Sequence, residues 1–569
     1  MAAAESSEWD AIVVGAGIGG LVCAGYLAAA GRRVLVLEQH DVAGGNAHVF
    51  RRRRAYEFDV GVHYLGDCGP GGLLPAILQG LAVLDRIRLL PMDPQGFDRI
   101  MLPSRTIDVP VGWAAYRDRL CAALPDERDG VTACVEVFEA IGEIMRAALV
   151  SPGEVALLTK RHPGALAWSR RPLARLFDEH RLSALARTVL AAQAGNYGAS
   201  PAGASVATHA SVMDHYLRGA YHLDGGGQTL VAALVEQVEA HGGRVRTRAC
   251  VRTIHTDGGA ASGVTLDDGE RIFAPVVVSN ADFCRTVIEL CSDTSGFPAG
   301  MVQRTRVATM RHAWAILYLG LTAQPARIDS ANLWWFDHED LEGAYRRFEA
   351  GDERLPFVFV SCASARPARH PWACPPGWGS LQVMAPCPVE MPRWDGGGRY
   401  RRDLEYRLRK DRLTTALLTA AEQAVGPIAG DIAHMETATP LSHQRYTRSM
   451  GGTPYGLADW GGIARRPDTA TAVTGLHTVG QSTRYGSGVA GAAVSGICCA
   501  GEILGRELLR EVYAGVVVAD SARLPRRAPD WDPLAVSRGR TRCAAPGLPK
   551  VPLVRAPQQP RSQTTGEDR

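Results

Sequence analysis

Glycine and acidic residues recur at defined intervals near the start of the chain, at Gly15, Gly17, Gly20 and Glu38. Gly15 permits a tight turn, Gly17 lets backbone N–H groups approach a pyrophosphate, and Gly20 allows a helix to pack closely. Glu38 can accept hydrogen bonds from ribose hydroxyls, which favours a nucleotide without a 2′-phosphate. The spacing therefore predicts a dinucleotide-binding site.

The flanking sequence predicts the elements that must position these residues. Residues 11–14 (AIVV) and 33–37 (RVLVL) are short apolar runs typical of buried strands, and a helical stretch begins at the glycines. The order of strand, glycine turn, helix, strand and acid is that of a Rossmann unit. In such a unit the helix N-terminus faces the phosphates with its partial positive charge.

A second glycine motif stands near the C-terminus, at Gly486, Gly488 and Gly491. Five residues separate it from Gly480, where the preceding strand is expected to end, whereas a phosphate-binding turn lies directly at a strand end. We therefore expect a helix whose N-terminus points at the same nucleotide. A separate NADPH domain is not indicated, and the electron donor or acceptor stays open.

Length and composition indicate a globular protein with more than one domain. The chain has 569 residues, 46% of them hydrophobic, and a net charge of +3, which gives no indication of nucleic-acid binding. Its 13 cysteines include no C-x-x-C pair, so we expect reduced thiols and no metal site. The first ten residues carry acids where a secretory signal carries basic residues, so a cytoplasmic location is expected.

Changes of pattern along the chain predict two interleaved domains. The nucleotide-binding domain is expected in residues 1–110, 221–304 and 471–517, and a substrate domain in residues 111–220, which have helical periodicity, and 305–470. Residues 518–569 are rich in proline and arginine, and we expect them to form a disordered tail.

Several longer segments carry a family resemblance. They read GGNAHVF (44–50), YEFDVGVHYLG (56–66), NYGASP (196–201), TPLSHQRY (439–446) and VGQSTRYGSGVAGA (479–492). With these segments the chain resembles the phytoene desaturase and carotenoid isomerase branch of FAD-dependent oxidoreductases, and within it the retinol saturases most. The resemblance implies an α/β fold in which a Rossmann-type FAD-binding domain is interleaved with an α+β substrate domain, as in amine oxidases and phytoene desaturases.

The resemblance also implies FAD as the cofactor and assigns roles to individual residues. Gly15, Gly17, Gly20 and Glu38 would hold the ADP half, Gly44 and Gly45 the pyrophosphate, Val251 the adenine, and Gly480, Gln481, Gly488 and Val489 the ribityl chain and flavin ring. Asn46 departs from the pattern, since many relatives place an arginine there against the pyrophosphate.

Three residues are candidates for proton transfer at the flavin. Saturation of a double bond needs a proton in addition to a hydride, and His63 and Tyr64 lie in the segment that resembles the family's approach to the flavin. A histidine can supply a proton near neutral pH. Tyr485 is a further candidate, and an alternative is that His63 only forms hydrogen bonds with the cofactor or the backbone.

Several functions fit the resemblance. Saturation of a lipophilic polyene such as a retinoid or carotenoid is favoured, and desaturation and redox-neutral cis–trans isomerisation stay open. A flavin amine oxidase is less favoured because Lys160 and Lys410 lie in charged, surface-like stretches. A non-catalytic flavin or lipid carrier is a further alternative. The expected partner is a lipophilic small molecule, and the resemblance suggests peripheral membrane contact.

Overall fold

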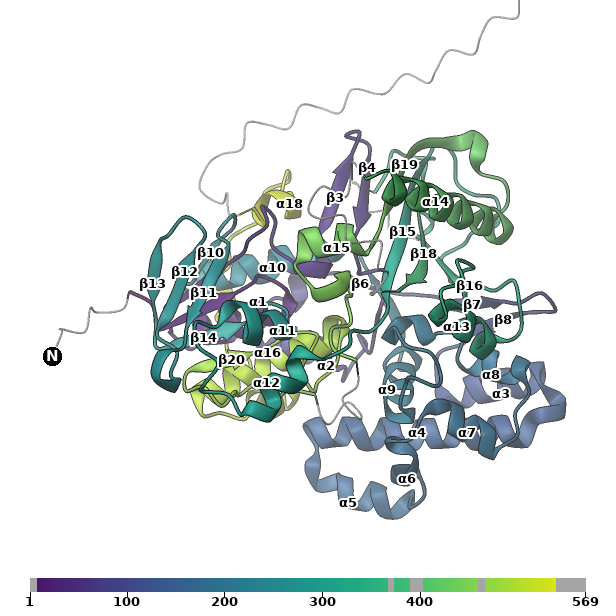
Figure 1. Cartoon of the computed structure of the whole chain (residues 1–569), viewed down its shortest axis with the longest axis horizontal. Helices are drawn as coiled ribbons and strands as arrows, with labels where there is room; N and C mark the ends of the chain where they lie inside the picture. The colour runs from purple at the N-terminus through teal and green to yellow at the C-terminus, as the bar shows by residue number, and fades with distance from the viewer. Residues whose placement is uncertain (1–7, 367–372, 389–402, 459–465, 539–569) are drawn as a thin grey trace, which may run out of the picture.

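The computed structural model describes residues 8–366, 373–388, 403–458 and 466–538. Two domains lie side by side, with the nucleotide-binding domain on the left of Figure 1 and the substrate domain on the right. Each domain is built from segments far apart in the sequence, because the chain passes between them several times.

A five-stranded parallel sheet forms the centre of the nucleotide-binding domain. Its strand order is β10 (Arg244–Arg246), β2 (Val34–Leu37), β1 (Ala11–Val14), β14 (Val276–Ser279) and β20 (Leu476–Thr478). One face packs against α1 (Ile18–Ala29), α10 (Gly227–Ala240) and α16 (Gly488–Leu504). The other face is covered by the antiparallel sheet of β11 (Val251–His255), β12 (Gly263–Leu266) and β13 (Arg271–Phe273). The strands are buried on both faces, which explains their continuous apolar runs.

A seven-stranded sheet forms the substrate domain. Its order is β19 (Ile432–Ala438), β15 (Ala313–Leu321), β18 (Gly379–Cys387), β17 (Val358–Cys362), β16 (Asn332–Trp335), β7 (Asp98–Met101) and β8 (Thr106–Val109). Side chains alternate along β15, so that Ala315 and Leu317 face α14 (Leu404–Val425) while Trp314 and Ile316 face the helical layer. The apolar cavity described below is lined from this second face.

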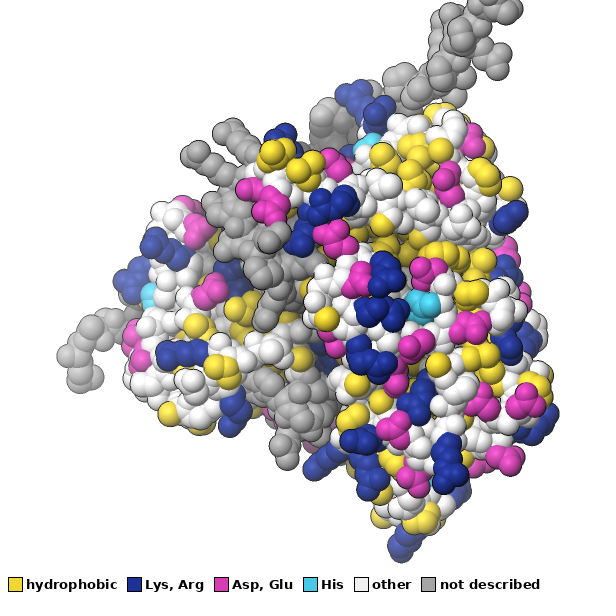
Figure 2. Space-filling view, turned by 45° about the vertical axis from the view of Figure 1, so that its right-hand side comes forward, with side chains coloured by type: hydrophobic (Ala, Val, Ile, Leu, Met, Phe, Trp, Pro, Cys, Tyr) yellow, Lys and Arg dark blue, Asp and Glu magenta, His cyan; other side chains and the backbone are white. Residues whose placement is uncertain are grey.

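The helical layer lies at the lower right of Figure 1. It consists of α3 (Trp113–Ala123), α4 (Arg128–Val150), α5 (Pro152–Arg161), α6 (Ala165–Ser169), α7 (Leu173–Glu179), α8 (Ala184–Leu190) and α9 (Val206–Leu217). In the part of the chain that the structure describes, no helix has the length and apolar character needed to cross a membrane. Acidic and basic side chains are interspersed over the face shown in Figure 2.

The remaining elements connect and cover the two domains. They are β3 (Val49–Arg52), β4 (Tyr56–Asp59), β5 (Leu65–Gly66), β6 (Leu89–Pro91), β9 (Ala220–Leu223), α2 (Leu73–Gly80), α11 (Phe283–Arg285), α12 (Ala299–Arg306), α13 (Leu341–Glu349), α15 (Pro440–Thr447), α17 (Leu508–Tyr513) and α18 (Pro533–Val536).

The structure differs from the expected domain boundaries in two places. Strands β7 and β8, which precede residue 110, belong to the substrate sheet because β7 pairs with β16. The expectation of disorder from residue 518 needs correction for residues 518–538, which pack on the nucleotide-binding domain. An arginine-rich composition is typical of disordered segments, but here Arg527 pairs with the buried Glu236. The rest of that tail lies outside the described residues.

Candidate active site

One cavity of about 780 Å³ runs between the two domains. Its nucleotide end is lined by the turns that follow β1 and β2, and its other end by aromatic and aliphatic side chains of the substrate domain. Of the predicted site residues, only Gly20 does not line it. Such a crevice at the carboxyl ends of parallel strands is where doubly wound folds bind nucleotides.

The first glycine turn has the close contacts expected of a phosphate-binding turn. Gly15 has a φ of +96°, which disfavours other residues. A Cβ on Gly17 would lie 2.6 Å from Asn280 Nδ2, and one on Gly20 would lie 2.4 Å from the Gly15 carbonyl oxygen. Gly20 thus serves helix packing, while Gly15 and Gly17 face the cavity.

Glu38 is fixed at the cavity wall by two backbone donors. The N–H groups of Ala16 and His40 each donate to its carboxylate over 2.8 Å. Burial raises the pKa of Glu38, and these hydrogen bonds oppose that shift. The carboxylate is therefore oriented where a ribose would lie beside the glycine turn.

The glycine pair forms a second turn beside the first. Gly44 and Gly45 have φ values of +131° and +55°, and the Gly44 N–H donates to the Ala16 carbonyl over 2.8 Å. Val251 lines the cavity from the neighbouring sheet. No side chain caps the N-terminus of α1 or of α16, and both of these ends line the cavity. Their N–H groups suit the anionic pyrophosphate and an electron-rich ring system.

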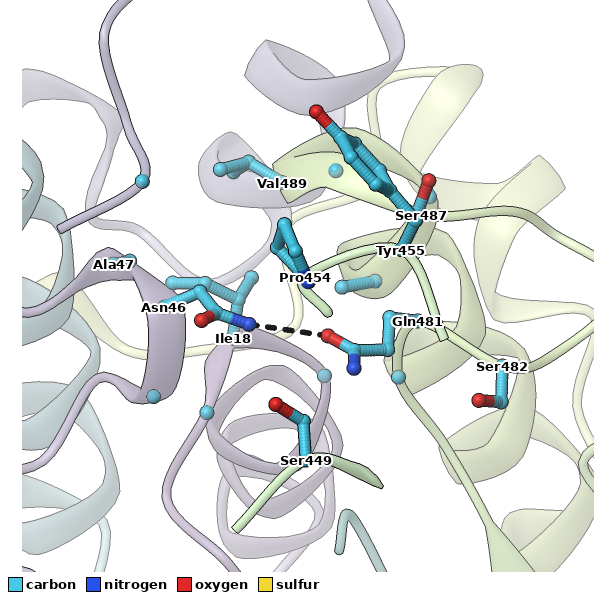
Figure 3. Close-up of a pocket in the computed structure, with 18 of the residues that line it drawn as sticks. Ile18, Asn46, Ala47, Ser449, Pro454, Tyr455, Gln481, Ser482, Ser487 and Val489 are labelled. Carbon is cyan, nitrogen blue, oxygen red and sulfur yellow. Dashed lines mark hydrogen bonds between the residues drawn. The ribbon is translucent and has the colours of Figure 1, made fainter. Parts of the chain in front are cut away.

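Asn46 and Gln481 meet across the middle of the cavity (Figure 3). Asn46 Nδ2 donates to Gln481 Oε1 over 3.1 Å, and Gln481 Nε2 donates to the Thr453 carbonyl over 3.2 Å. The Gln481 carbonyl accepts from Arg466 Nη2 over 2.7 Å. Asn46, which stands where many relatives place a longer arginine, thus has Gln481 as its partner. Its amide links the N-terminal and C-terminal parts of the site.

The far end of the cavity is an aromatic chamber. Tyr64 stacks on Tyr216 with ring centroids 4.2 Å apart, and Phe359 and Trp334 extend the same wall. Aliphatic side chains such as Met384 complete it. A chamber of this kind fits an extended apolar molecule.

His63 lines the cavity, and its surroundings shift its pKa. Burial lowers the pKa of His63 to about 3, the nearby Arg366 lowers it further, and a hydrogen bond with Gln382 opposes the shift. Burial thus disfavours the imidazolium form that a histidine acid needs, and the proton-donor role of His63 stays a prediction. The alternative of a hydrogen-bonding role fits this geometry better.

Tyr64 belongs to a buried polar network. Its hydroxyl accepts a hydrogen bond from Asn196 Nδ2 over 2.8 Å and donates to Asp98 Oδ2 over 3.1 Å. Asp98 has 0% of its surface exposed and also accepts from Gln193, Asn332 and Trp334. Burial raises the pKa of Asp98 and, with the neighbouring carboxyl group, that of Tyr64.

Tyr485 lies on a different wall, just before the N-terminus of α16 and near Gly488 and Val489. Burial raises the pKa of its hydroxyl, and the Cys498 thiol beside it adds to the shift. The described contacts of Tyr485 include no buried carboxyl group comparable to Asp98. Tyr64 is therefore the candidate with the more developed proton-transfer network.

Three residues of the site were not predicted from the sequence. They are Asp98, Arg466, and Asn196, which is a partner of Tyr64. Asp98 gave little signal, since half of the residues in its strand, DRIM, are charged, although a buried acid marks either a structural or a functional site. Arg466 gave none, because its contacts with the carbonyls of Tyr455 and Gln481 depend on the fold.

Comparisons with known proteins agree with this geometry. Residues 18–287 match the family described as flavin containing amine oxidoreductase. The chain is 27% identical to an all-trans-retinol 13,14-reductase of Danio rerio, covering 90% of this chain and 89% of the relative. It is 27% identical to prolycopene isomerase 2 of an Oncidium hybrid cultivar, covering 87% and 84%.

The fold is also found among solved structures. An oxidoreductase from Methanosarcina mazei superposes with a TM-score of 0.61 at 16% identity, covering 87% of this chain and 100% of that one. The resemblance inferred from the sequence, the Rossmann-type fold and FAD as the cofactor are thereby confirmed. The glycine turns, Glu38 and the two helix N-termini fit FAD.

Proposed function

We propose that this FAD-dependent oxidoreductase, which is similar along most of its length to retinol 13,14-reductases and prolycopene isomerases, saturates a carbon–carbon double bond of a lipophilic polyene. The observation that carries this proposal is the continuity of one cavity from the nucleotide turns to the aromatic chamber. A retinoid or carotenoid would lie along Tyr64, Phe359 and Trp334 with its reacting bond toward the Asn46–Gln481 contact.

The bound FAD supplies hydride transfer, and the chain supplies binding, exclusion of water and a proton. We assign the proton to Tyr64, which lines the chamber and whose hydroxyl is held by Asp98. Asp98 accepts a hydrogen bond from the Tyr64 hydroxyl over 3.1 Å and thereby orients it, and the hydrogen bonds that Asp98 accepts oppose the rise of its pKa by burial. Asn196 fixes the hydroxyl from the other side.

Redox-neutral isomerisation is the second candidate. Prolycopene isomerase 2 of the Oncidium hybrid cultivar matches at the same 27% identity as the retinol reductase of Danio rerio, and the same chamber would accept a cis polyene. Desaturation would take place in the same cavity, with electrons passing from the substrate to the flavin. These three outcomes differ in product mass and in the redox state of the flavin.

Amine oxidation receives less support from the cavity. Among its lining residues in the described part of the chain there is no lysine, whereas several flavin amine oxidases use one near the flavin. Lys160 lies on α5 and Lys410 on α14, outside the cavity. A non-catalytic carrier would not need the Tyr64–Asp98 network.

Peripheral membrane contact is part of the same proposal, because a polyene partitions into lipid. Leu157 on α5 and Leu166 on α6 are 60% and 39% exposed, and Lys160 and Arg161 lie beside them. Figure 2 shows hydrophobic and basic side chains together at the lowest tip of the molecule. Such a pairing suits an anionic lipid surface.

Product analysis tests the function. The protein is incubated without oxygen with retinoids and carotenoid precursors, once with reduced and once with oxidised flavin. Saturation predicts a product that gains two hydrogens only with the reduced flavin. A product of equal mass would instead assign an isomerase, and a loss of two hydrogens with the oxidised flavin would assign a desaturase. Amine turnover without any polyene product would overturn the proposal.

A further inference from the structure

We propose that residues 518–538, here called the C-terminal strap, hold the glycine-pair loop (residues 41–48) in its FAD-binding shape and thereby set the affinity for FAD. The strap follows α17, contacts Gly80 and Glu236, and ends at α18, which packs against α10. Helices α18 and α10 are labelled in Figure 1. This inference rests on FAD binding alone and is independent of the proposed substrate.

The buried Glu236 on α10 fastens the middle of the strap. Its carboxylate accepts from Arg527 Nη2 over 3.0 Å, from Trp531 Nε1 over 2.7 Å, and from Arg86 Nη1 over 2.7 Å. The Arg527 guanidinium lies 3.8 Å from the centre of the Trp531 ring. Loss of the Glu236 carboxylate would leave the partly buried Arg86 and Arg527 without this partner. The attachment of the strap to α10 therefore depends on Glu236.

The end of the strap contacts the glycine-pair loop directly. The Ala43 N–H donates to the Ser537 carbonyl over 2.9 Å, and Leu534 packs against Val42 and Val49. Asp532 pairs with Arg51 on β3, immediately after the loop, through contacts of 2.8 and 2.7 Å.

The same loop faces FAD on its other side. The residue after Ala43 is Gly44, whose N–H donates to the Ala16 carbonyl of the first glycine turn, and residues 44–48 line the cavity. Gly44 and Gly45 have positive φ values and gain conformational freedom when released. FAD binding to a released loop would therefore include the entropic cost of ordering it.

Full-length variants test this coupling. Apoprotein of the wild type, of Glu236→Gln and of the control Glu511→Gln is titrated with FAD. The dissociation rate of FAD is measured from the flavin fluorescence after dilution of each holoprotein into flavin-free buffer. Glu511 pairs with Arg506 at the surface before the strap, so its loss leaves the loop intact. We expect Glu236→Gln to raise the Kd for FAD about tenfold or more, with faster release, and Glu511→Gln to leave both unchanged.

The wild-type protein offers a reciprocal test. If attachment of the strap raises the affinity for FAD, bound FAD must stabilise the attached strap by the same factor. Saturating FAD should therefore slow trypsin cleavage of the strap after the exposed Arg523 and Arg526 about tenfold relative to apoprotein. Cleavage elsewhere in the chain, compared in the same digest, corrects for general stabilisation.

Two results would overturn the proposal. One is an unchanged Kd in Glu236→Gln when trypsin shows that its strap is released, and the other is equal strap cleavage with and without FAD. If Glu236→Gln does not fold, Leu534→Ala loosens the contact with Val42 and Val49 without removing a charge. A smaller rise in Kd is then expected, and an unchanged Kd contradicts the coupling.

Discussion

The Tyr64 hydroxyl donates a hydrogen bond to Asp98 Oδ2 over 3.1 Å, joining a side chain at the cavity wall to a fully buried carboxyl group. Tyr64 follows the β3–β4 hairpin, and Asp98 begins a strand of the substrate sheet. The contact thus connects the segment that approaches the flavin with the domain that holds the substrate. A buried carboxyl group behind a tyrosine is an arrangement suited to proton delivery.

Tyr64→Phe should lower the rate of polyene saturation by about 10² to 10⁴, the usual contribution of a positioned acid. The stacking on Tyr216 is retained in this variant, so FAD content and substrate binding should change little. The rate of flavin reoxidation by substrate is the measurement. Tyr221→Phe serves as the matched control, because Tyr221 on β9 lies outside the cavity. A Tyr64→Phe enzyme of wild-type rate would exclude Tyr64 as the donor.

Asn46→Ala should weaken FAD binding about fivefold to tenfold, because it removes the hydrogen bond to Gln481 and frees that side chain in the cavity. FAD titration of apoprotein measures the effect. Gln95→Ala is a suitable comparison, since Gln95 is exposed and lies outside the cavity. Equal Kd values for both variants would show that the Asn46–Gln481 contact has no role in cofactor binding.

Gly20→Ala should abolish FAD binding and lower the free energy of unfolding by about 1 to 3 kcal/mol, as overpacking does. The new Cβ would lie 2.4 Å from the Gly15 carbonyl oxygen and force the turn apart. Gly153→Ala on α5 meets no atom within 4 Å and should be neutral or slightly stabilising. Thermal unfolding and flavin content of the two variants check this, and a fully loaded Gly20→Ala protein would contradict it.

Acidification should destabilise the protein between about pH 6.5 and 4. Burial lowers the pKa of His63 and His209 to about 3, and that of His48, His222, His312 and His443 to about 4. In this window the unfolded chain binds protons that the folded chain does not, so stability falls with pH. At pH 5 a fully buried histidine such as His209 contributes a loss of roughly 2 kcal/mol.

Thermal unfolding from pH 7 to pH 5 checks this for the wild type and for His209→Gln. His209 lies outside the cavity, so FAD binding should not confound the comparison. The variant should lose less stability on acidification than the wild type. Parallel losses would mean that His209 is not buried in its neutral form.

Local patterns predicted much of the nucleotide-binding domain. The glycine turns and the buried strands β1 and β2 have sequence signals of their own, and Glu38 follows from them by spacing. The substrate sheet was harder to predict, because β7 pairs with β16 from a distant part of the chain. The partners of Tyr64 and the attachment of the strap through Glu236 likewise depend on tertiary contacts that no local pattern encodes.

The most direct test of the central claim is a single turnover of the reduced enzyme. Flavin in the purified protein is reduced without oxygen and mixed with a polyene substrate while its absorbance and the product mass are followed. We expect one molecule of product with two added hydrogens for each flavin reoxidised. Reduced flavin that persists with every retinoid and carotenoid tested, or protein that binds no flavin, would contradict it.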